Sequence, residues 1–229
     1  MRLAIVGYGK MGKMIAGLAP QYGFEVCAAL DIGWDAAELT AARPGVAIEF
    51  STPETAVGNI ERLAALRVPT VCGTTGWLKD LDRARAAVDE HGSALVYSAN
   101  FSIGVNVFQR LAEEAARLLK DEESYEAWAW EIHHSAKKDA PSGTLLQLVA
   151  AMRGAGYSRP VSESSNRAGS HPGTHEIGFD SAADTITLRH AARSREGFAR
   201  GALKAAQWVA DKKGVHHFTE VLFGGAKCS

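Results

Sequence analysis

A glycine-rich turn between a short apolar run and a helical pattern constrains the fold of this chain more than any other feature. Residues 3–6 are apolar, which is typical of a buried parallel strand. Gly-Tyr-Gly-Lys-Met-Gly follows directly, and the next apolar residues recur at helical spacing. In a Gly-x-Gly-x-x-Gly turn the glycines permit a tight turn, close approach of a pyrophosphate and close helix–strand packing. The pattern predicts a Rossmann-type α/β domain that binds a dinucleotide through Gly7, Tyr8, Gly9, Lys10, Met11 and Gly12.

The end of the second predicted strand supplies a candidate ribose-binding carboxylate. The strand at 24–30 ends in Asp31, roughly twenty residues after the glycine turn, as dinucleotide-binding folds require. Asp31 can accept hydrogen bonds from the ribose of NADH and would repel the 2′-phosphate of NADPH. Lys10 is the only nearby cation that the sequence indicates, so we expect NADH to be preferred or both cofactors to be accepted. Trp34 is equally compatible with stacking on adenine and with a partly buried packing role. For the whole motif, the alternative is an ordinary βαβ unit with a glycine turn and a surface Asp.

Three more strands are expected to extend this parallel sheet, at 46–50, 69–72 and 94–97. Thr52 and Pro53 give a clear start to the helix that follows the first of them. Small-residue loops follow the other two strands. Ligands of open α/β sheets bind at such carboxyl ends, although ordinary turn chemistry also explains the loops.

A second dense motif starts where a predicted strand at 125–130 ends. Residues 131–144 read Glu-Ile-His-His-Ser-Ala-Lys-Lys-Asp-Ala-Pro-Ser-Gly-Thr, and a helical pattern follows. Ser142 is a preferred N-cap, Gly143 lets an anion approach the helix N-terminus, and Thr144 can add a donor. His133 and Lys137 would add a proton donor and a cation. The motif predicts a carboxylate or phosphate site, with a plain capped helix as the alternative.

This motif resembles the signature of the 4-hydroxy-tetrahydrodipicolinate reductase (dihydrodipicolinate reductase) family of lysine and diaminopimelate biosynthesis. The chain matches every fixed position of the family pattern Glu-x-His-His-x-x-Lys-x-Asp-Ala-Pro-Ser-Gly-Thr. The resemblance continues through the loops at 73–76 and 100–105, the segment 167–175 and the helical pattern at 198–208. Two features depart from it: the glycine turn is one residue tighter than the commoner form, and the loop before Arg167 is short.

The resemblance implies a reaction and its residues. It implies NAD(P)H-dependent reduction of dihydrodipicolinate, formed from 4-hydroxy-tetrahydrodipicolinate, to tetrahydrodipicolinate. His133 would donate and accept the proton, and Lys137 would be its cationic partner. The roles of Arg167, His171 and His175 stay open. The substrate carboxylates would be bound by His134, Ser142, Gly143 and Thr144, and the nicotinamide side of the cofactor by Gly73, Thr74, Thr75, Ser98, Ala99, Asn100 and Phe101.

The resemblance also implies the domain organisation. Residues 1–103 and 197–229 would form a discontinuous dinucleotide-binding domain. Residues 104–196 would form an α+β domain with a mixed sheet, which binds substrate and mediates assembly into a homotetramer. Strands are expected there at 174–179 and 184–190, and the segment 162–174 is expected to be a loop rich in Ser, Gly and Pro.

Composition excludes several other classes of function. A net charge of −1 with 22% charged residues favours neither a nucleic-acid nor a membrane partner. No signal-peptide pattern precedes the first strand and no apolar run is long enough to span a bilayer, so we expect a cytoplasmic protein. Cys27, Cys72 and Cys228 are scattered, and the pairs 133–134 and 216–217 would point to opposite faces, so no metal site is expected.

Two other functions remain open. One is a different oxidoreductase on the same scaffold, acting on another small oxo- or imino-acid. The other is a non-enzymatic dinucleotide sensor, which would keep the glycine turn but would not need His133 and Lys137.

Overall fold

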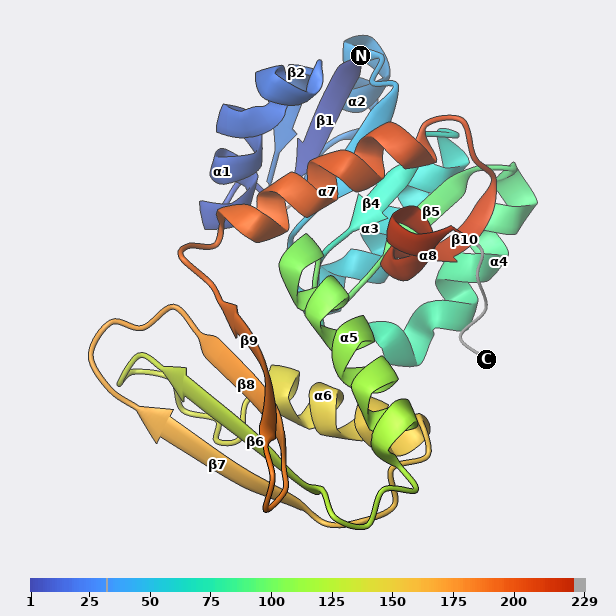
Figure 1. The fold of residues 1–229 in the computed structure, drawn as a ribbon. Coiled ribbons are helices and arrows are strands. Elements are labelled where there is room, and N and C mark those ends of the chain that lie inside the picture. The colour runs from blue at the N-terminus through green and yellow to red at the C-terminus, as the bar shows by residue number, and fades with distance from the viewer. Residues whose placement is uncertain (32, 225–229) are drawn as a thin grey trace. The chain divides into compact units, whose positions relative to one another are not determined.

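The computed structural model describes residues 1–31 and 33–224, so Cys228 lies outside the described residues. The chain divides into two compact units (Figure 1). Unit 1 comprises Met1–Ile103 and the stretch that starts at Glu196, and unit 2 comprises Gly104–Arg195. None of the described helices is long and apolar enough to cross a membrane.

Unit 1 is built on a parallel sheet of six strands in the order β10-β5-β4-β3-β1-β2. Its inner strands are mostly apolar and, apart from Arg2, buried, as expected for a parallel sheet that is covered on both faces. The strand order reverses between β1 and β3, and such a switch point is where α/β sheets bind ligands. The strands are β1 (Arg2–Val6), β2 (Glu25–Leu30), β3 (Val46–Glu49), β4 (Thr70–Cys72), β5 (Ala94–Tyr97) and β10 (Gly214–His217).

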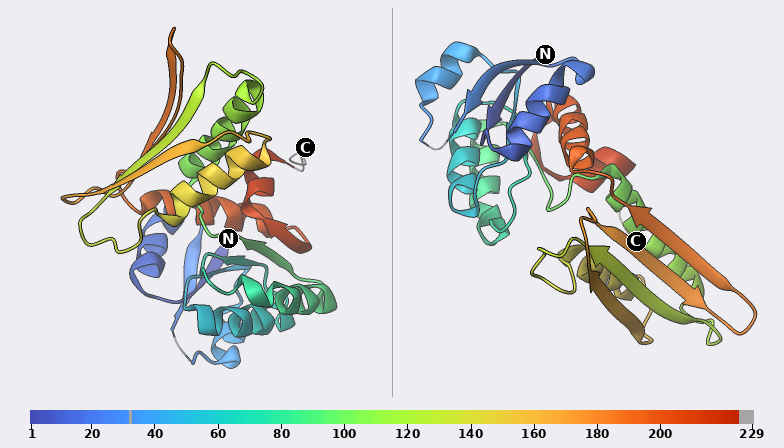
Figure 2. Two further views of the ribbon diagram at one scale, coloured as in Figure 1. Left: turned by 90° about the horizontal axis from the view of Figure 1, so that it is seen from below. Right: turned by 90° about the vertical axis from the view of Figure 1, so that its left-hand side faces the viewer.

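Helices cover both faces of this sheet (Figure 2). The helices α1 (Lys10–Leu18) and α7 (Glu196–Val209) pack on one face, and α3 (Pro53–Ala65) and α4 (Leu81–His91) pack on the other. The start of α3 at Thr52 and Pro53 is as predicted, and α7 packs against the apolar core of unit 1. The remaining helical segments are η1 (Ala19–Tyr22), α2 (Ala36–Ala42), η2 (Leu78–Asp80) and α8 (Phe218–Phe223).

Unit 2 contains a mixed sheet in the order β7-β6-β8-β9. The central strand β6 (Glu126–His133) runs parallel to β7 (Val161–Arg167) and antiparallel to β8 (Thr174–Asp180), which pairs with β9 (Thr185–Ala191). The helices α5 (Ile103–Leu119) and α6 (Gly143–Gly154) contribute to the apolar core on one face of this sheet.

Strand β7 corrects the first part of the loop predicted at 162–174, whereas residues 168–173 do lie outside any helix or strand. Its sequence, Val-Ser-Glu-Ser-Ser-Asn-Arg, has no apolar alternation, and its side chains are mostly exposed or half-buried. The strand forms because its backbone pairs with β6 over seven residues at the edge of the sheet. The prediction therefore failed where backbone pairing, and not side-chain burial, decides the structure.

Candidate functional site

The glycine turn after β1 leaves the N-terminus of α1 open. Gly7 has a φ of +91°, in the left-handed region that favours glycine, and a Cβ atom there would collide with the backbone of Phe50. A Cβ atom on Gly12 would collide with the Gly7 carbonyl oxygen. Around Gly9, the N-cap of α1, a Cβ atom would meet nothing within 4 Å, and no side chain caps the helix. This turn fits a pyrophosphate group that accepts hydrogen bonds from the helix N-terminus.

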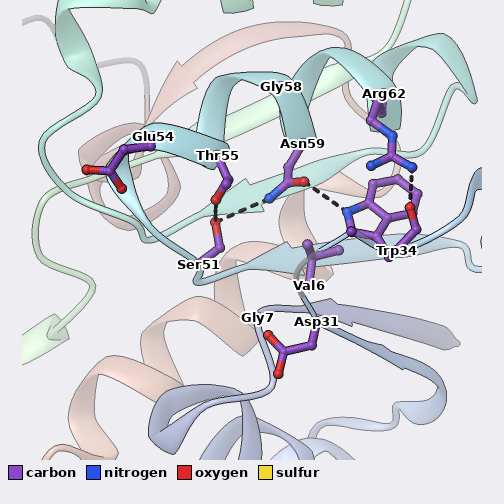
Figure 3. A pocket seen from close by; sticks show the side chains of 11 residues that line it. Val6, Gly7, Asp31, Trp34, Ser51, Glu54, Thr55, Gly58, Asn59 and Arg62 are labelled. Atoms are coloured by element: carbon purple, nitrogen blue, oxygen red, sulfur yellow. Dashed lines mark hydrogen bonds between the residues drawn. The ribbon is translucent and has the colours of Figure 1, made fainter.

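A pocket of about 240 Å³ lies at the ends of β1 and β2 in unit 1 (Figure 3). Asp31, Trp34 and Arg62 line it together. Trp34 is buried, its indole N–H donates to Asn59 Oδ1 at 2.9 Å, and Arg62 Cζ lies 3.7 Å from the ring centroid. Arg62 also donates to the backbone carbonyl of Trp34. One face of the indole is therefore covered by a guanidinium group.

Arg62 corrects the prediction that Lys10 is the only cation near Asp31. The two residues lie on different elements, because Asp31 ends β2 whereas Arg62 belongs to α3. Lys10 is exposed at the first position of α1. The residues that neighbour Asp31 in the sequence carry no sign of this cation, because the fold supplies it from another helix.

A buried carboxylate that the sequence interpretation did not select holds the strand ends near the pocket. Glu49 is fully buried and accepts hydrogen bonds from Ser51 N–H (3.1 Å), Asn59 Nδ2 (3.2 Å) and Thr74 Oγ1 (2.7 Å). Cys72 Sγ also lies 3.1 Å from Glu49, and burial together with Glu49 raises the pKa of this thiol well above 9.0. A lone charge inside the apolar run 46–50 was the available signal for Glu49.

The loops after β4 and β5 are fixed by internal contacts. A Cβ atom on Gly73 would collide with the ring of Phe50, so this position requires glycine. The Ser98 hydroxyl donates to the carbonyl of Asn100 at 3.0 Å and accepts from its N–H at 3.1 Å. The ring of Phe101 is buried, with its centroid 4.7 Å from that of Phe218. The ring of Phe101 is therefore not available to a ligand.

In unit 2, strand pairing gathers a cluster around Glu131. Glu131 faces Ser165 on β7 and His175 on β8, and His133 faces Arg167 on β7. Glu131 is fully buried and accepts from Ser165 Oγ at 2.9 Å and from Arg167 Nη2 at 2.8 Å. Its Oε2 lies 3.4 Å from His133 Nδ1 and 3.3 Å from His175 Nε2. The sheet register thus places two histidines and one arginine around a single carboxylate.

The same carboxylate anchors the start of α6. The Ser142 backbone N–H donates to Glu131 Oε1 at 2.8 Å, and the Ser142 hydroxyl donates to Glu131 Oε2. The hydroxyl also accepts from Leu145 N–H at 3.2 Å, which makes Ser142 the N-cap, as predicted. Because the Ser142 hydroxyl is directed into this buried network, Gly143 and Thr144 are the more accessible residues at the helix start.

The electrostatics of the cluster keep Glu131 charged and the histidines neutral. Burial alone would raise the pKa of Glu131, but hydrogen bonds from Ser142 and Arg167 outweigh it and lower the pKa from 4.5 to about 2. Burial, and then the neighbouring His133, lower the pKa of His175 from 6.5 to about 4. Burial also lowers the pKa of His133, which Glu131 raises and Lys137 lowers. Lys137 is therefore close enough to act on His133.

Glu131, His133 and His175 offer ligand atoms within 4.8 Å of one another, a grouping that could hold a metal ion. The prediction of no metal site rested on adjacent histidines, whereas these three residues meet through the pairing of β6 with β8. The contacts of Glu131 disfavour a cation there, because the guanidinium of Arg167 and the donors of Ser142 and Ser165 already bind the carboxylate. His134, the neighbour of His133, is half-buried outside this group.

Taken together, these features define a class of protein. Unit 1 combines a doubly wound parallel sheet with a turn that fits a pyrophosphate, and unit 2 combines a histidine, a lysine and a helix N-terminus suited to an anion. This is the arrangement of an oxidoreductase that uses a nicotinamide dinucleotide.

Comparison with known proteins identifies the family. The models "Dihydrodipicolinate reductase, N-terminus" and "Dihydrodipicolinate reductase, C-terminus" match residues 1–101 and 104–222. The chain is 35% identical to a 4-hydroxy-tetrahydrodipicolinate reductase of Christiangramia forsetii, covering 97% of this chain and 98% of the relative. It is 36% identical to the Archaeoglobus fulgidus protein of that name, covering 97% and 100%. The chain belongs to the dihydrodipicolinate reductase family.

Solved structures agree with this assignment at the level of the fold. A dipicolinate-bound dihydrodipicolinate reductase from Paenisporosarcina sp. TG-14 matches with a TM-score of 0.82 and 22% identity, covering 95% of this chain and 97% of that one. An amine dehydrogenase from Mycobacterium smegmatis matches with a TM-score of 0.65 and 11% identity, covering 94% of each chain.

Proposed function

We propose that the protein reduces dihydrodipicolinate to tetrahydrodipicolinate with NADH or NADPH, in lysine and diaminopimelate biosynthesis. The family assignment indicates this reaction, and the relative that binds dipicolinate is consistent with a small planar dicarboxylate. The observation that carries the proposal is the group in unit 2 formed by His133, Lys137 and the start of α6. Unit 1 binds the dinucleotide, and unit 2 binds the substrate.

His133 is the proposed proton donor. The reaction adds one hydride and one proton to the substrate ring, so electron density that builds up on the ring must be neutralised. The imidazole is 9% exposed, and its Nδ1 atom is buried, 3.4 Å from Glu131, without a hydrogen-bond partner among the described residues. When His133 is protonated, Nδ1–H faces this ionised carboxylate, which stabilises the imidazolium.

Glu131 therefore positions the His133 ring, and Gly173 has a similar role. A Cβ atom on Gly173 would lie 2.9 Å from His133 Nε2, and its φ of +142° also favours glycine. The missing side chain lets the start of β8 approach the imidazole. Both residues fix the ring, and neither needs to touch the substrate.

Lys137 and the first turn of α6 are the proposed carboxylate site. The lysine supplies a cation, and Gly143 and Thr144 supply backbone N–H groups at the positive end of the helix dipole. A Cβ atom on Gly143 would meet nothing within 4 Å, so there is room for an anion. We propose that His134 also binds a substrate carboxylate and that Ser142 orients the start of the helix.

The bound cofactor would supply the hydride, and the residues of unit 1 would hold it. Gly7, Gly9 and Gly12 shape the pyrophosphate turn. Asp31 would accept hydrogen bonds from the adenosine ribose, and it lines one pocket with Arg62. Tyr8, Lys10 and Met11 belong to the turn, and the loops of residues 73–75 and 98–101 remain the proposed nicotinamide side.

We also propose that the protein is a cytoplasmic homotetramer. The two described cysteines, Cys27 and Cys72, are free thiols, as suits a reducing compartment. Trp128, Trp130 and Ile132 form a half-buried apolar strip on the face of β6 that is opposite to its core-facing residues. A strip of this kind is suited to burial against another copy of the chain.

The direct test is NAD(P)H oxidation in the presence of dihydrodipicolinate synthase, pyruvate and aspartate semialdehyde. His133→Ala should lower kcat by roughly 10²-fold, the usual scale for a general acid–base group, and Lys137→Ala, which removes the cation that binds the substrate, should lower kcat/KM by a similar factor. Cofactor affinity, measured by fluorescence titration, should hardly change. Lys138→Ala removes the exposed neighbouring lysine and should keep native turnover. Near-native turnover of either site variant would remove that residue from the mechanism.

A further inference from the structure

The cation of the proposed carboxylate site already binds a carboxylate of its own chain. Lys137 Nζ donates to both oxygens of Asp139 at 2.8 Å. The side chain of Lys137 is 24% exposed and that of Asp139 is 56% exposed. The pair therefore lies at the surface, where a ligand can reach both groups.

Asp139 also interacts with the start of α6. Its pKa lies below the ordinary value, first because of Lys137, and further because of its own backbone N–H and that of Gly143. The Asp139 carboxylate thus already binds Lys137, the cation that we assign to the substrate carboxylate. Arg167 donates to the backbone carbonyl of Asp139, which ties this loop to β7.

We propose that Asp139 is an internal competitor that occupies the substrate-carboxylate site and sets the affinity for the dicarboxylate; the proposal rests on the function proposed above. To bind, a substrate carboxylate takes Lys137 Nζ from Asp139 and accepts a hydrogen bond from the N–H of Gly143. The Asp139 side chain then turns to solvent, to which it is already more than half exposed. The backbone of the loop stays in place through Arg167.

The expected effect is modest. When a side chain of the protein itself closes the site, the apparent affinity for a ligand equals the affinity of the open site multiplied by the fraction of molecules in which the site is open. Exposed ion pairs are weak, so the open fraction is substantial. We expect Asp139→Asn to lower the KM for the substrate and the Kd for dipicolinate by roughly three- to fivefold, with kcat within about twofold of wild type. Asp139→Ala should act in the same direction.

The experiment measures dipicolinate binding by isothermal titration calorimetry and steady-state kinetics on the full-length protein. Glu114→Gln is the matched control, because Glu114 also forms an exposed ion pair in unit 2, with Arg117 on α5. It removes the same charge and should leave KM and Kd unchanged. Circular dichroism checks the folding of each variant.

The outcomes separate this inference from the proposed function. If wild type is active but Asp139→Asn raises KM or lowers kcat, Asp139 positions Lys137 and the competitor role is wrong. An unchanged Kd and KM in both Asp139 variants also overturns it. An equal gain in Glu114→Gln would mean that net charge alone is responsible. If wild type does not reduce dihydrodipicolinate at all, it is the proposed function that fails.

Discussion

At the scale of the residue, Arg62 changes what Asp31 alone suggests about the cofactor. A carboxylate at the end of the second strand favours NADH, because it binds the ribose hydroxyls and repels a 2′-phosphate. The structure places a guanidinium in the same pocket, stacked on Trp34. Arginine binds phosphate through two parallel hydrogen bonds, so Arg62 can offset the repulsion from Asp31.

We therefore predict that Arg62→Met lowers kcat/KM for NADPH by roughly tenfold, about 1.4 kcal/mol, and lowers that for NADH by less than about threefold. Asp31→Ala should shift the preference the other way, toward NADPH. Fluorescence titration of both cofactors separates binding from turnover. Lys79→Met, a basic-to-apolar change at an exposed residue of η2, is the control. Equal losses for the two cofactors would mean that Arg62 acts through Trp34 or adenine and not through the phosphate.

At the scale of the element, one face of β6 contributes both to the apolar core and to the polar site. Ala127 and Ala129 face the apolar core, and farther along the same face Glu131 and His133 form the site. A strand places alternate residues on one face, so the site is continuous with the core. Its charge state therefore affects the stability of unit 2 as well as its chemistry.

The pH dependence of stability follows from two groups on this face. The pKa of His175 falls from 6.5 to about 4 on folding, and that of Glu131 falls from 4.5 to about 2. Between the unfolded and the folded pKa of each group, the native state binds fewer protons than the unfolded state. The free energy of unfolding therefore decreases as pH falls through this range. His175 lowers the free energy of unfolding as pH decreases from 6.5 to 4. Glu131 lowers it by about 3 kcal/mol as pH decreases from 4.5 to 2.

We predict that the melting temperature of wild type decreases as pH falls from 6.5 to 4.5, and that His175→Gln weakens this dependence. The dependence is reduced and not abolished, because burial lowers the pKa of His133 and His190 as well. His171→Gln, at an exposed histidine, should keep the wild-type slope. Differential scanning calorimetry across this range makes the comparison. An unchanged slope in His175→Gln would place the buried proton-linked group elsewhere.

At the scale of the whole molecule, the outer face of the mixed sheet is the feature that suggests assembly. Trp128 lies across Gly178, where a Cβ atom would collide with the indole ring. Trp130 is held by a hydrogen bond of 2.9 Å from its indole N–H to Asn166 Oδ1. The two tryptophans are therefore held against the sheet, and aromatic groups of this kind are enriched at subunit interfaces.

We predict that the wild-type protein has four times the 24.4 kDa mass of the chain in solution, and that a charge on this strip lowers it. Trp130→Glu combined with Ile132→Glu should give dimers or monomers by light scattering, because an apolar interface does not tolerate unpaired buried charges. Leu78→Lys alters an exposed apolar residue of unit 1 and should keep the wild-type mass. A wild-type monomer would contradict the proposed tetramer.

Much of this protein can be predicted from contiguous stretches of its sequence. The turn at residues 7–12 follows its strand directly, and Ser142 and Thr52 begin their helices as predicted. The motif at 131–144 also indicated the family, which the comparisons confirm. Such signals are readable because a turn, a cap and a strand–helix junction depend on residues that are close together in the chain.

Only the tertiary structure decided which distant residues meet. The register of β6 with β7 and β8 brings Ser165, Arg167 and His175 to Glu131, and the position of α3 brings Arg62 to the pocket of Asp31. The strand β7 itself was missed, because it forms through backbone pairing. Spacing along a chain carries no information about register across a sheet, since packing and backbone hydrogen bonds set it. The chemistry of single motifs was therefore predictable, and the pairing of their charges was not.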